Sequence, residues 1–398
     1  CVCSGGGALA GIGLISPFYL TPSTAFAVSA PFLDADSAYA SAFIGLAIAA
    51  FSVQGVISGG RIARKVGESS DVLLAAAAAM TAILVFRWSM PASLSPDPLA
   101  AIGVILAGWV LIAADGAAAA KRALGIAALF AAAAAAIKLQ GAAAFLVVAI
   151  LMGARRENPR GRPIAFWVGL ILVGASGFRL NLLASGCLFP PIATSCLSLP
   201  WAVPPDEVAA YGAGVRAFST PWSDDPGLQS FLAWAKSDLS SAVVMCVALL
   251  ATMATALRLR GSGLAAVFWI AIGGLALSLY GSPAGRFALG YAALAVGLAV
   301  ALYAPRSLLG PRSATAAAAG VALLGVAAWS TGPQVAQRAG AIAAGSSAVS
   351  PLLAPAPVIR VDLHPGVAPG TRITYAQIET PVGPMPTARE GLCWDQPA

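Results

Sequence analysis

Residues 178–205 read FRLNLLASGCLFPPIATSCLSLPWAVPP, and this stretch differs from most of the sequence around it. It holds two cysteines, one arginine and several prolines, whereas its flanks consist mainly of long apolar runs. Because each proline removes a helical hydrogen bond and clashes with the preceding turn, we expect a proline-punctuated loop here. We place this large loop at residues 177–238, between two membrane-crossing helices.

The composition of the chain is typical of a helical membrane protein. Hydrophobic residues fill 59% of the 398 positions, charged residues fill 10%, and the mean hydropathy is +0.84. Water-soluble chains carry charge on about a quarter of their residues. Apolar runs of about 15 to 20 residues, separated by short breaks, predict membrane-spanning helices. We therefore expect an all-α, polytopic transmembrane helical bundle in residues 1–331 and a proline-rich tail in residues 332–398.

About ten spans can be placed by counting apolar runs between charged or proline-rich breaks. One long run, 123–152, is divided into two short spans at Lys138. The other predicted spans are 38–58, 72–86, 99–114, 164–176, 239–257, one that ends at Tyr280, 287–303 and 314–329.

The basic residues between these spans predict an orientation. With ten spans, 13 lysines and arginines fall on one side of the membrane and 6 on the other, when the long tail is left aside. The first set is Arg61, Arg64, Lys65, Lys121, Arg122, Arg155, Arg156, Arg160, Arg162, Arg258, Arg260, Arg306 and Arg312, and the second is Arg87, Lys138, Arg179, Arg216, Lys236 and Arg286. Basic loops stay on the cytoplasmic side. The large loop and the tail are then extracytoplasmic, in a bacterial plasma membrane.

Several functional classes are disfavoured by the sequence. The net charge of +7 is concentrated in the short loops, where it serves orientation, so we expect no nucleic-acid partner. A GxxxxGK[ST] phosphate loop is absent, and the short basic loops leave no room for a nucleotide-binding domain. No spacing suggests a metal or a Ser-His-Asp triad, and the single histidine, His364, lies in the tail. We expect no cofactor, with a divalent metal left open.

Four charged residues on the predicted outer side are candidate site residues. Lys138 lies in an apolar stretch, where an ionised side chain costs a few kcal/mol unless it snorkels or finds a partner. Snorkelling and phosphate binding are both open for Lys138, and interfacial anchoring is the alternative for Arg179 and Arg286. Asp97 lies between two prolines, and capping of the following helix is the alternative to a role in binding or as a base.

Cys187 and Cys196 are nine positions apart on the predicted oxidising side. This placement favours a disulfide that closes part of the large loop, with two free buried thiols as the alternative. Cys246 lies within a predicted span, where a cysteine usually packs as an inert residue.

Several short motifs carry a family resemblance. They are LASGCLFPPIATSCLSLPWAVP, KLQ at Lys138, SLSPDPLA around Asp97, SPAGRFALG around Arg286 and CWDQP at Cys393. From about Pro22 to its end, the chain resembles an uncharacterised family of bacterial polytopic membrane proteins. That family is in turn similar to the GT-C type glycosyltransferases, which take sugars from polyprenyl-phosphate carriers on the outer face of the membrane.

The resemblance implies transfer of a sugar from a polyprenyl-phosphate-linked donor to a cell-envelope acceptor. Lys138, Arg179 and Arg286 would bind the phosphate, because cations neutralise the charge that develops on the leaving group. Asp97 would bind the acceptor or act as general base. The partners implied are the lipid bilayer and the lipid-linked sugar.

The chain departs from this pattern near its start. GT-C enzymes carry an acidic loop there, but CVCSGGGALAGIGLISPFYL contains neither a carboxylate nor a histidine. We therefore expect a fragment that lacks the true beginning, or a chain that is not catalytic. Two rival functions stay open: a transporter or flippase of an anionic lipid-linked substrate, and a non-catalytic protein of envelope assembly.

Overall fold

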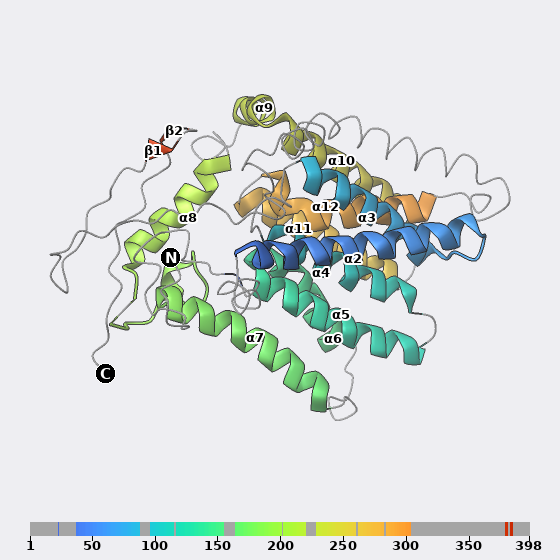
Figure 1. Cartoon of the computed structure of the whole chain (residues 1–398), viewed down its shortest axis with the longest axis horizontal. Helices are drawn as coiled ribbons and strands as arrows, with labels where there is room; N and C mark the ends of the chain where they lie inside the picture. The colour runs from blue at the N-terminus through green and yellow to red at the C-terminus, as the bar shows by residue number, and fades with distance from the viewer. Residues whose placement is uncertain are drawn as a thin grey trace. The chain divides into compact units, whose positions relative to one another are not determined.

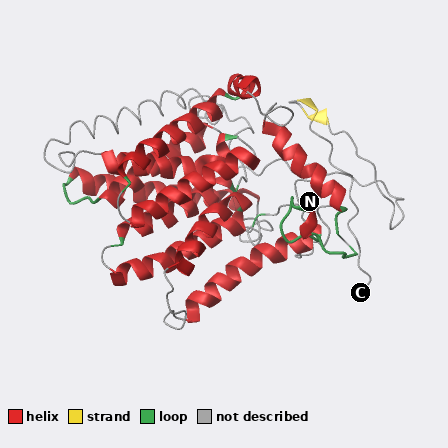
Figure 2. Cartoon of the chain, turned by 180° about the vertical axis from the view of Figure 1, so that it is seen from behind, coloured by secondary structure: helices red, strands yellow, loops and turns green. Residues whose placement is uncertain are grey.

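The computed structural model describes residues 23, 37–87, 96–114, 117–154, 164–200, 202–219, 228–259, 262–281, 284–303, 379–380 and 383–384. Helices dominate this part of the chain, and the one strand pair described is β1 (Glu379–Thr380) with β2 (Gly383–Pro384), as Figure 2 shows. The all-α expectation is therefore confirmed for the described residues.

The helices follow the apolar runs of the sequence. They are α2 (Ser37–Ala63), α3 (Ser69–Arg87), α4 (Asp97–Ala113), α5 (Ala117–Ile137), α6 (Ala142–Ala154), α7 (Ile164–Ser185), α8 (Pro205–Ser219), α9 (Leu228–Ser237), α10 (Leu239–Arg258), α11 (Ser262–Gly281) and α12 (Gly285–Tyr303), with short 3-10 helices η5 (Leu139–Gly141) and η7 (Ala193–Ser195).

Four of the described helices are long and apolar enough to cross a membrane. Their qualifying segments are Leu46–Ala63 of α2, Leu239–Arg258 of α10, Gly263–Gly281 of α11 and Gly285–Tyr303 of α12. Shorter apolar helices lie at Ser69–Val85, Asp97–Ala113, Arg122–Ile137 and Leu139–Gly153. The predicted span 314–329 lies outside the described residues.

The large loop that we predicted at residues 177–238 is, in its described part, mostly helical. The helix α7 continues to Ser185 because FRLNLLAS contains no residue that breaks a helix, and α8 begins at Pro205, where proline is well tolerated. Asp206 and Glu207 lie in the first turn of α8, near its partial positive charge. These segments are therefore helical, and the assignment of residues 177–238 to a connection between two membrane spans stays a prediction.

The chain divides into two compact units. Among the described residues, one unit contains 23, 175–215 and the β1–β2 pair, and the other contains 37–174 and 216–303. The division at residue 331 that we expected from the sequence stays a prediction.

The larger unit is a helical bundle organised around α12. This helix packs against α3, α4, α10 and α11, and α4 packs in turn against α3, α5 and α11, as Figure 1 shows. Side chains of Leu73, Ile105, Leu275 and Leu294 are fully buried in the shared core.

Glycines let α12 approach its neighbours at backbone distance. A Cβ added to Gly290 would lie 2.8 Å from the Cα of Ala101 in α4, and one added to Gly297 would lie 2.7 Å from the carbonyl oxygen of Leu73 in α3. Small residues at such crossings are how apolar helices pack without a hydrophobic driving force between them. The position of α12 is therefore fixed by two backbone contacts.

The smaller unit contains the end of α7, the disulfide-bonded segment and most of α8. The sulfur atoms of Cys187 and Cys196, the pair that the sequence favours, are bonded, and Cys187 packs with Val203 and Val208. Gly186 ends α7 with a φ of +75°, and a Cβ there would lie 2.5 Å from that of Ala202. Both features require glycine at this position.

Candidate functional site

The candidate site lies at the end of the larger unit where α4, α10 and α12 begin. The α10 and α12 helices run in the same direction, because the Gly285 N–H donates to Ser241 Oγ (2.7 Å) at their starts and the Arg258 guanidinium stacks on Tyr303 (4.1 Å) at their ends. The start of α4 joins them, since Asp97 and Arg286 line one cavity. Three helix N-termini, each partially positive, thus lie at this end.

Lys138 is placed at this end by a tight connection between α5 and α6. Its backbone is extended (φ −153°, ψ 138°), its N–H donates to Ala134 O (2.9 Å), and its carbonyl accepts from the Gly141 N–H (2.8 Å). A Cβ on Gly141 would lie 2.3 Å from the carbonyl carbon of Ala134, so this turn requires glycine.

Lys138 and Asp97 form an ion pair between the end of α5 and the start of α4. The Lys138 ammonium donates to Asp97 Oδ1, and the two side chains are 23% and 4% exposed. Asp97 occupies the first position of α4, where the helix dipole also favours a carboxylate. The N-cap residue of α4 is Pro96, so Asp97 lies one position inside the cap, and its carboxylate neutralises Lys138.

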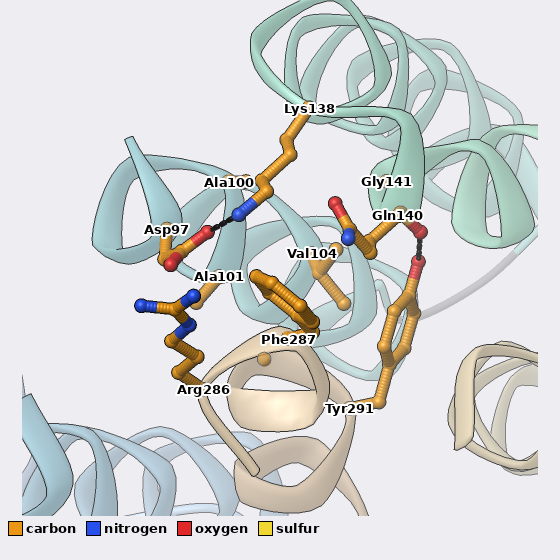
Figure 3. Close-up of a pocket in the computed structure, with 11 residues that line it drawn as sticks. Asp97, Ala100, Ala101, Val104, Lys138, Gln140, Gly141, Arg286, Phe287 and Tyr291 are labelled. Carbon is orange, nitrogen blue, oxygen red and sulfur yellow. Dashed lines mark hydrogen bonds and ion pairs between the residues drawn. The ribbon is translucent and has the colours of Figure 1, made fainter. Parts of the chain in front are cut away.

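A single aromatic ring lies against both cations of the site. The Phe287 ring centroid is 4.1 Å from Lys138 Nζ and 4.8 Å from Arg286 Cζ. Figure 3 shows Lys138 reaching Asp97 from the end of α5, while the exposed Arg286 side chain points toward Asp97 from α12. Cations are attracted to the faces of aromatic rings, more strongly where water is excluded.

Gln140 and Tyr291 form the inner side of the same cavity. The Tyr291 hydroxyl donates to the Gln140 carbonyl oxygen, while Gln140 Oε1 is buried and has no hydrogen-bond partner within the described residues. The cavity has a volume of about 20 Å³, which suits one water molecule.

Asp238 lies next to this cluster, at the N-cap of α10. Its Oδ1 accepts from the Ser241 N–H (3.1 Å) and the Ser240 hydroxyl (2.9 Å). Burial opposes ionisation of Asp238, but the hydrogen bonds from Ser241 and Ser240 and the positive charge of Arg286 outweigh it, so its pKa is lowered. The site thus contains two carboxylates and two cations.

The sequence of residues 7–293 matches the family described as Domain of unknown function (DUF8201). The chain belongs to the DUF8201 family. No curated protein and no solved structure matches it significantly. The DUF8201 match contains Asp97, Lys138, Asp238, Arg286 and Tyr291, so the whole candidate site lies within the family's domain.

The DUF8201 chain brings together three of the four residues singled out from its sequence. Asp97, Lys138 and Arg286 line one cavity. Arg179 has an exposed side chain on the part of α7 that belongs to the smaller unit, so its convergence with the other two cations stays a prediction.

Sequence reasoning missed the pairing of Asp97 with Lys138 and the roles of Gln140, Phe287 and Tyr291. One signal was present: α4 and α5 are consecutive helices separated by only three residues in sequence, and such neighbours usually pack antiparallel, with the start of the first beside the end of the second. Phe287 and Tyr291 are four positions apart and so share a face of α12.

Among the described residues of this DUF8201 chain, no group of three or more His, Cys, Asp or Glu side chains lies close enough to bind a metal ion. The described residues therefore provide no ligand set for the divalent metal that the sequence analysis left open.

Proposed function

We propose that this protein is an integral membrane enzyme that transfers a sugar from a polyprenyl-phosphate carrier to a cell-envelope acceptor. The observation that supports the proposal most is the convergence of Asp97, Lys138 and Arg286 at one end of an apolar helical bundle. Ionisable groups at such a position are costly and usually functional. The resemblance to GT-C type glycosyltransferases supplies the reaction class.

The proposed chemistry needs the three groups in distinct roles. An acceptor hydroxyl attacks the anomeric carbon of the donor sugar, a new glycosidic C–O bond forms, and the bond to the carrier phosphate breaks. Lys138 and Arg286 bind the phosphate and stabilise the negative charge that it keeps as it leaves. The hydroxyl proton passes to the Asp97 carboxylate, which acts as general base.

The charges at the two ends of the bundle support an extracytoplasmic location for the site. The opposite end carries Arg61 in the last turn of α2, Arg64 and Lys65 directly after α2, and Arg258 at the end of α10. Basic residues that flank spans favour the cytoplasm. The proposal therefore places the Asp97 end of the bundle on the outer face of a bacterial plasma membrane.

A transporter or flippase of an anionic lipid-linked substrate is the second candidate. The small volume of the cavity, about 20 Å³, favours it, because a carrier passes through states in which its central site is narrowed. Such a carrier would use the same two cations to bind a lipid phosphate without breaking a bond.

The test is a transfer assay with the full chain reconstituted in nanodiscs. Radiolabelled polyprenyl-phosphate sugars are supplied with a membrane extract as acceptor, and the label that leaves the carrier is measured. We expect Lys138→Met and Arg286→Ala to lower transfer by about a hundredfold, the scale for loss of one charge-stabilising group. Arg258→Ala, at the opposite end, is the matched control and should leave transfer unchanged.

Two results would contradict the enzyme proposal. Equal transfer by all three variants would show that the cluster takes no part in the reaction. Movement of intact carrier across liposome membranes, with no sugar released and with dependence on Lys138, would establish the transporter instead.

A further inference from the structure

Two positive charges in the site are held against one aromatic ring. The ring of Phe287 attracts both Lys138 and Arg286, but the two cations repel each other. A compact cluster of this kind is stable when an anion lies between or beside the cations. In the structure the Asp97 carboxylate supplies that anion, through its ion pair with Lys138.

The cavity that these residues line is small. Its volume of about 20 Å³ suits one water molecule. Asp97 is 4% exposed and is fixed at the first turn of α4, so its carboxylate has little room to move. Lys138 is 23% exposed and carries its charge on a flexible four-carbon stem. Lys138 is therefore the group that can change partner.

We propose that Asp97 holds the place of the substrate phosphate in the resting protein and that Lys138 exchanges the Asp97 carboxylate for the phosphate when the substrate binds. This inference rests on the proposed function, because it assumes that a phosphate lipid enters the site. The exchange leaves Phe287 stacked against both cations, which then bridge the phosphate.

The exchange makes two contacts of Lys138 mutually exclusive: its ion pair with Asp97 in the resting protein and its contact with the phosphate in the loaded site.

A binding measurement separates this exchange from a purely structural ion pair. If Asp97 competes with phosphate for Lys138, then Asp97→Asn removes the competing charge while keeping the shape of the side chain. We expect Asp97→Asn to bind polyprenyl phosphate about tenfold more tightly than the unchanged chain, which corresponds to about 1.4 kcal/mol. A structural ion pair predicts unchanged or weaker binding in this variant.

The experiment uses the full chain in nanodiscs, with polyprenyl phosphate titrated into the bilayer and binding followed by native mass spectrometry. Asp71→Asn is the matched control, because Asp71 also forms an ion pair in the first turn of a helix, with Arg61. We expect it to leave binding unchanged. We expect Lys138→Met to weaken binding of polyprenyl phosphate both as a single substitution and in combination with Asp97→Asn. A parallel titration with inorganic phosphate distinguishes a lipid headgroup from free phosphate as the source of the anion.

The outcomes separate the two proposals. Binding by the unchanged chain that Asp97→Asn fails to tighten would overturn the exchange and leave the proposed function standing. Absence of polyprenyl phosphate binding in the unchanged chain and in Asp97→Asn would overturn both. Tighter binding by Asp97→Asn with no sugar transfer by the unchanged chain would support the exchange and contradict the enzyme.

Discussion

Two ion pairs in the larger unit have the same arrangement of helix ends but differ in their surroundings. In each, a carboxylate in the first turn of a helix meets a cation from another helix end: Asp71 of α3 meets Arg61, and Asp97 of α4 meets Lys138. The carboxylates are similarly buried, at 9% and 4% exposed, but the Arg61 side chain is 50% exposed and that of Lys138 is 23% exposed. The two pairs therefore differ in how exposed the cation is, and not in how exposed the carboxylate is.

Sequence separation adds a second difference. Arg61 and Asp71 are 10 positions apart and span one helix connection, where the Glu68 N–H also donates to Asp71 (3.0 Å). Lys138 and Asp97 are 41 positions apart and meet only when α4 and α5 have packed together. The first pair stabilises a local turn, and the second depends on the tertiary fold and faces a cavity.

The largest expected effect comes from removing each carboxylate. Asp97→Ala should lower the free energy of unfolding by about 3 kcal/mol, because it leaves a partly buried lysine without its partner. Asp71→Ala should cost about 1 kcal/mol or less, since Arg61 can be hydrated. Unfolding of the detergent-solubilised chain by SDS or heat measures both.

A double variant provides the control for that comparison. Asp97→Ala with Lys138→Ala should recover part of the lost stability, because the unpaired charge is gone. If the two single carboxylate variants were equally destabilised, the difference in surroundings that we describe would have no energetic consequence.

A smaller effect is expected from the aromatic ring that supports the buried pair. Phe287→Leu removes the ring beneath Lys138 and Arg286 and should cost about 1 to 2 kcal/mol. At the opposite end Tyr303→Leu removes the ring beneath the exposed Arg258, and here the loss of the cation contact should be about 0.5 to 1 kcal/mol. Thermal unfolding of both variants tests this order. If the Phe287 effect persisted unchanged in a Lys138→Met background, it would arise from packing and not from the cation.

The smallest effect concerns Asp238 and has a pH signature. Because the folded-state pKa of Asp238 is lowered, its contribution to stability is present above its unfolded pKa of about 3.9 and is lost as the pH falls through the folded value. Asp238→Asn keeps an efficient helix cap, so we expect a small change at pH 6. Below about pH 4 the unchanged chain should lose more stability than the Asn variant. The two proteins share all their other carboxylates. If their stabilities fell in parallel as the pH was lowered, ionised Asp238 would make no contribution to stability.

Much of the helical framework was predictable from the sequence, and the reason is chemical. Long apolar runs between charged breaks leave few options other than helices, so the predicted spans 72–86, 99–114 and 287–303 coincide closely with α3, α4 and α12. The break at Lys138 was predictable in the same way. Whether each such helix crosses a membrane is a separate matter, and four of those described meet the length and apolarity required.

The candidate site was predictable as a set of residues but not as a geometry. Asp97, Lys138 and Arg286 stood out because charge is rare in this chain, yet hydropathy does not say which helix ends meet. Phe287, Gln140 and Tyr291 look like ordinary members of apolar segments. Their roles depend on the packing of α12 against the start of α4, which a single sequence does not encode as a pattern. The helices within the predicted large loop were missed for a related reason, since their weak apolar character was taken to indicate a loop.

The close packing of α12 bears on how quickly the site can respond to a substrate. With Gly290 against Ala101 and Gly297 against Leu73, this helix cannot slide without breaking contacts at two levels of the bundle. Such helix displacements take microseconds to milliseconds, whereas side-chain rotations take picoseconds to nanoseconds. If Lys138 and Arg286 alone rearrange, the cavity opens on the faster of these timescales. Lateral diffusion of a scarce lipid toward the protein, and not the protein's own motion, would then limit how often the site is filled.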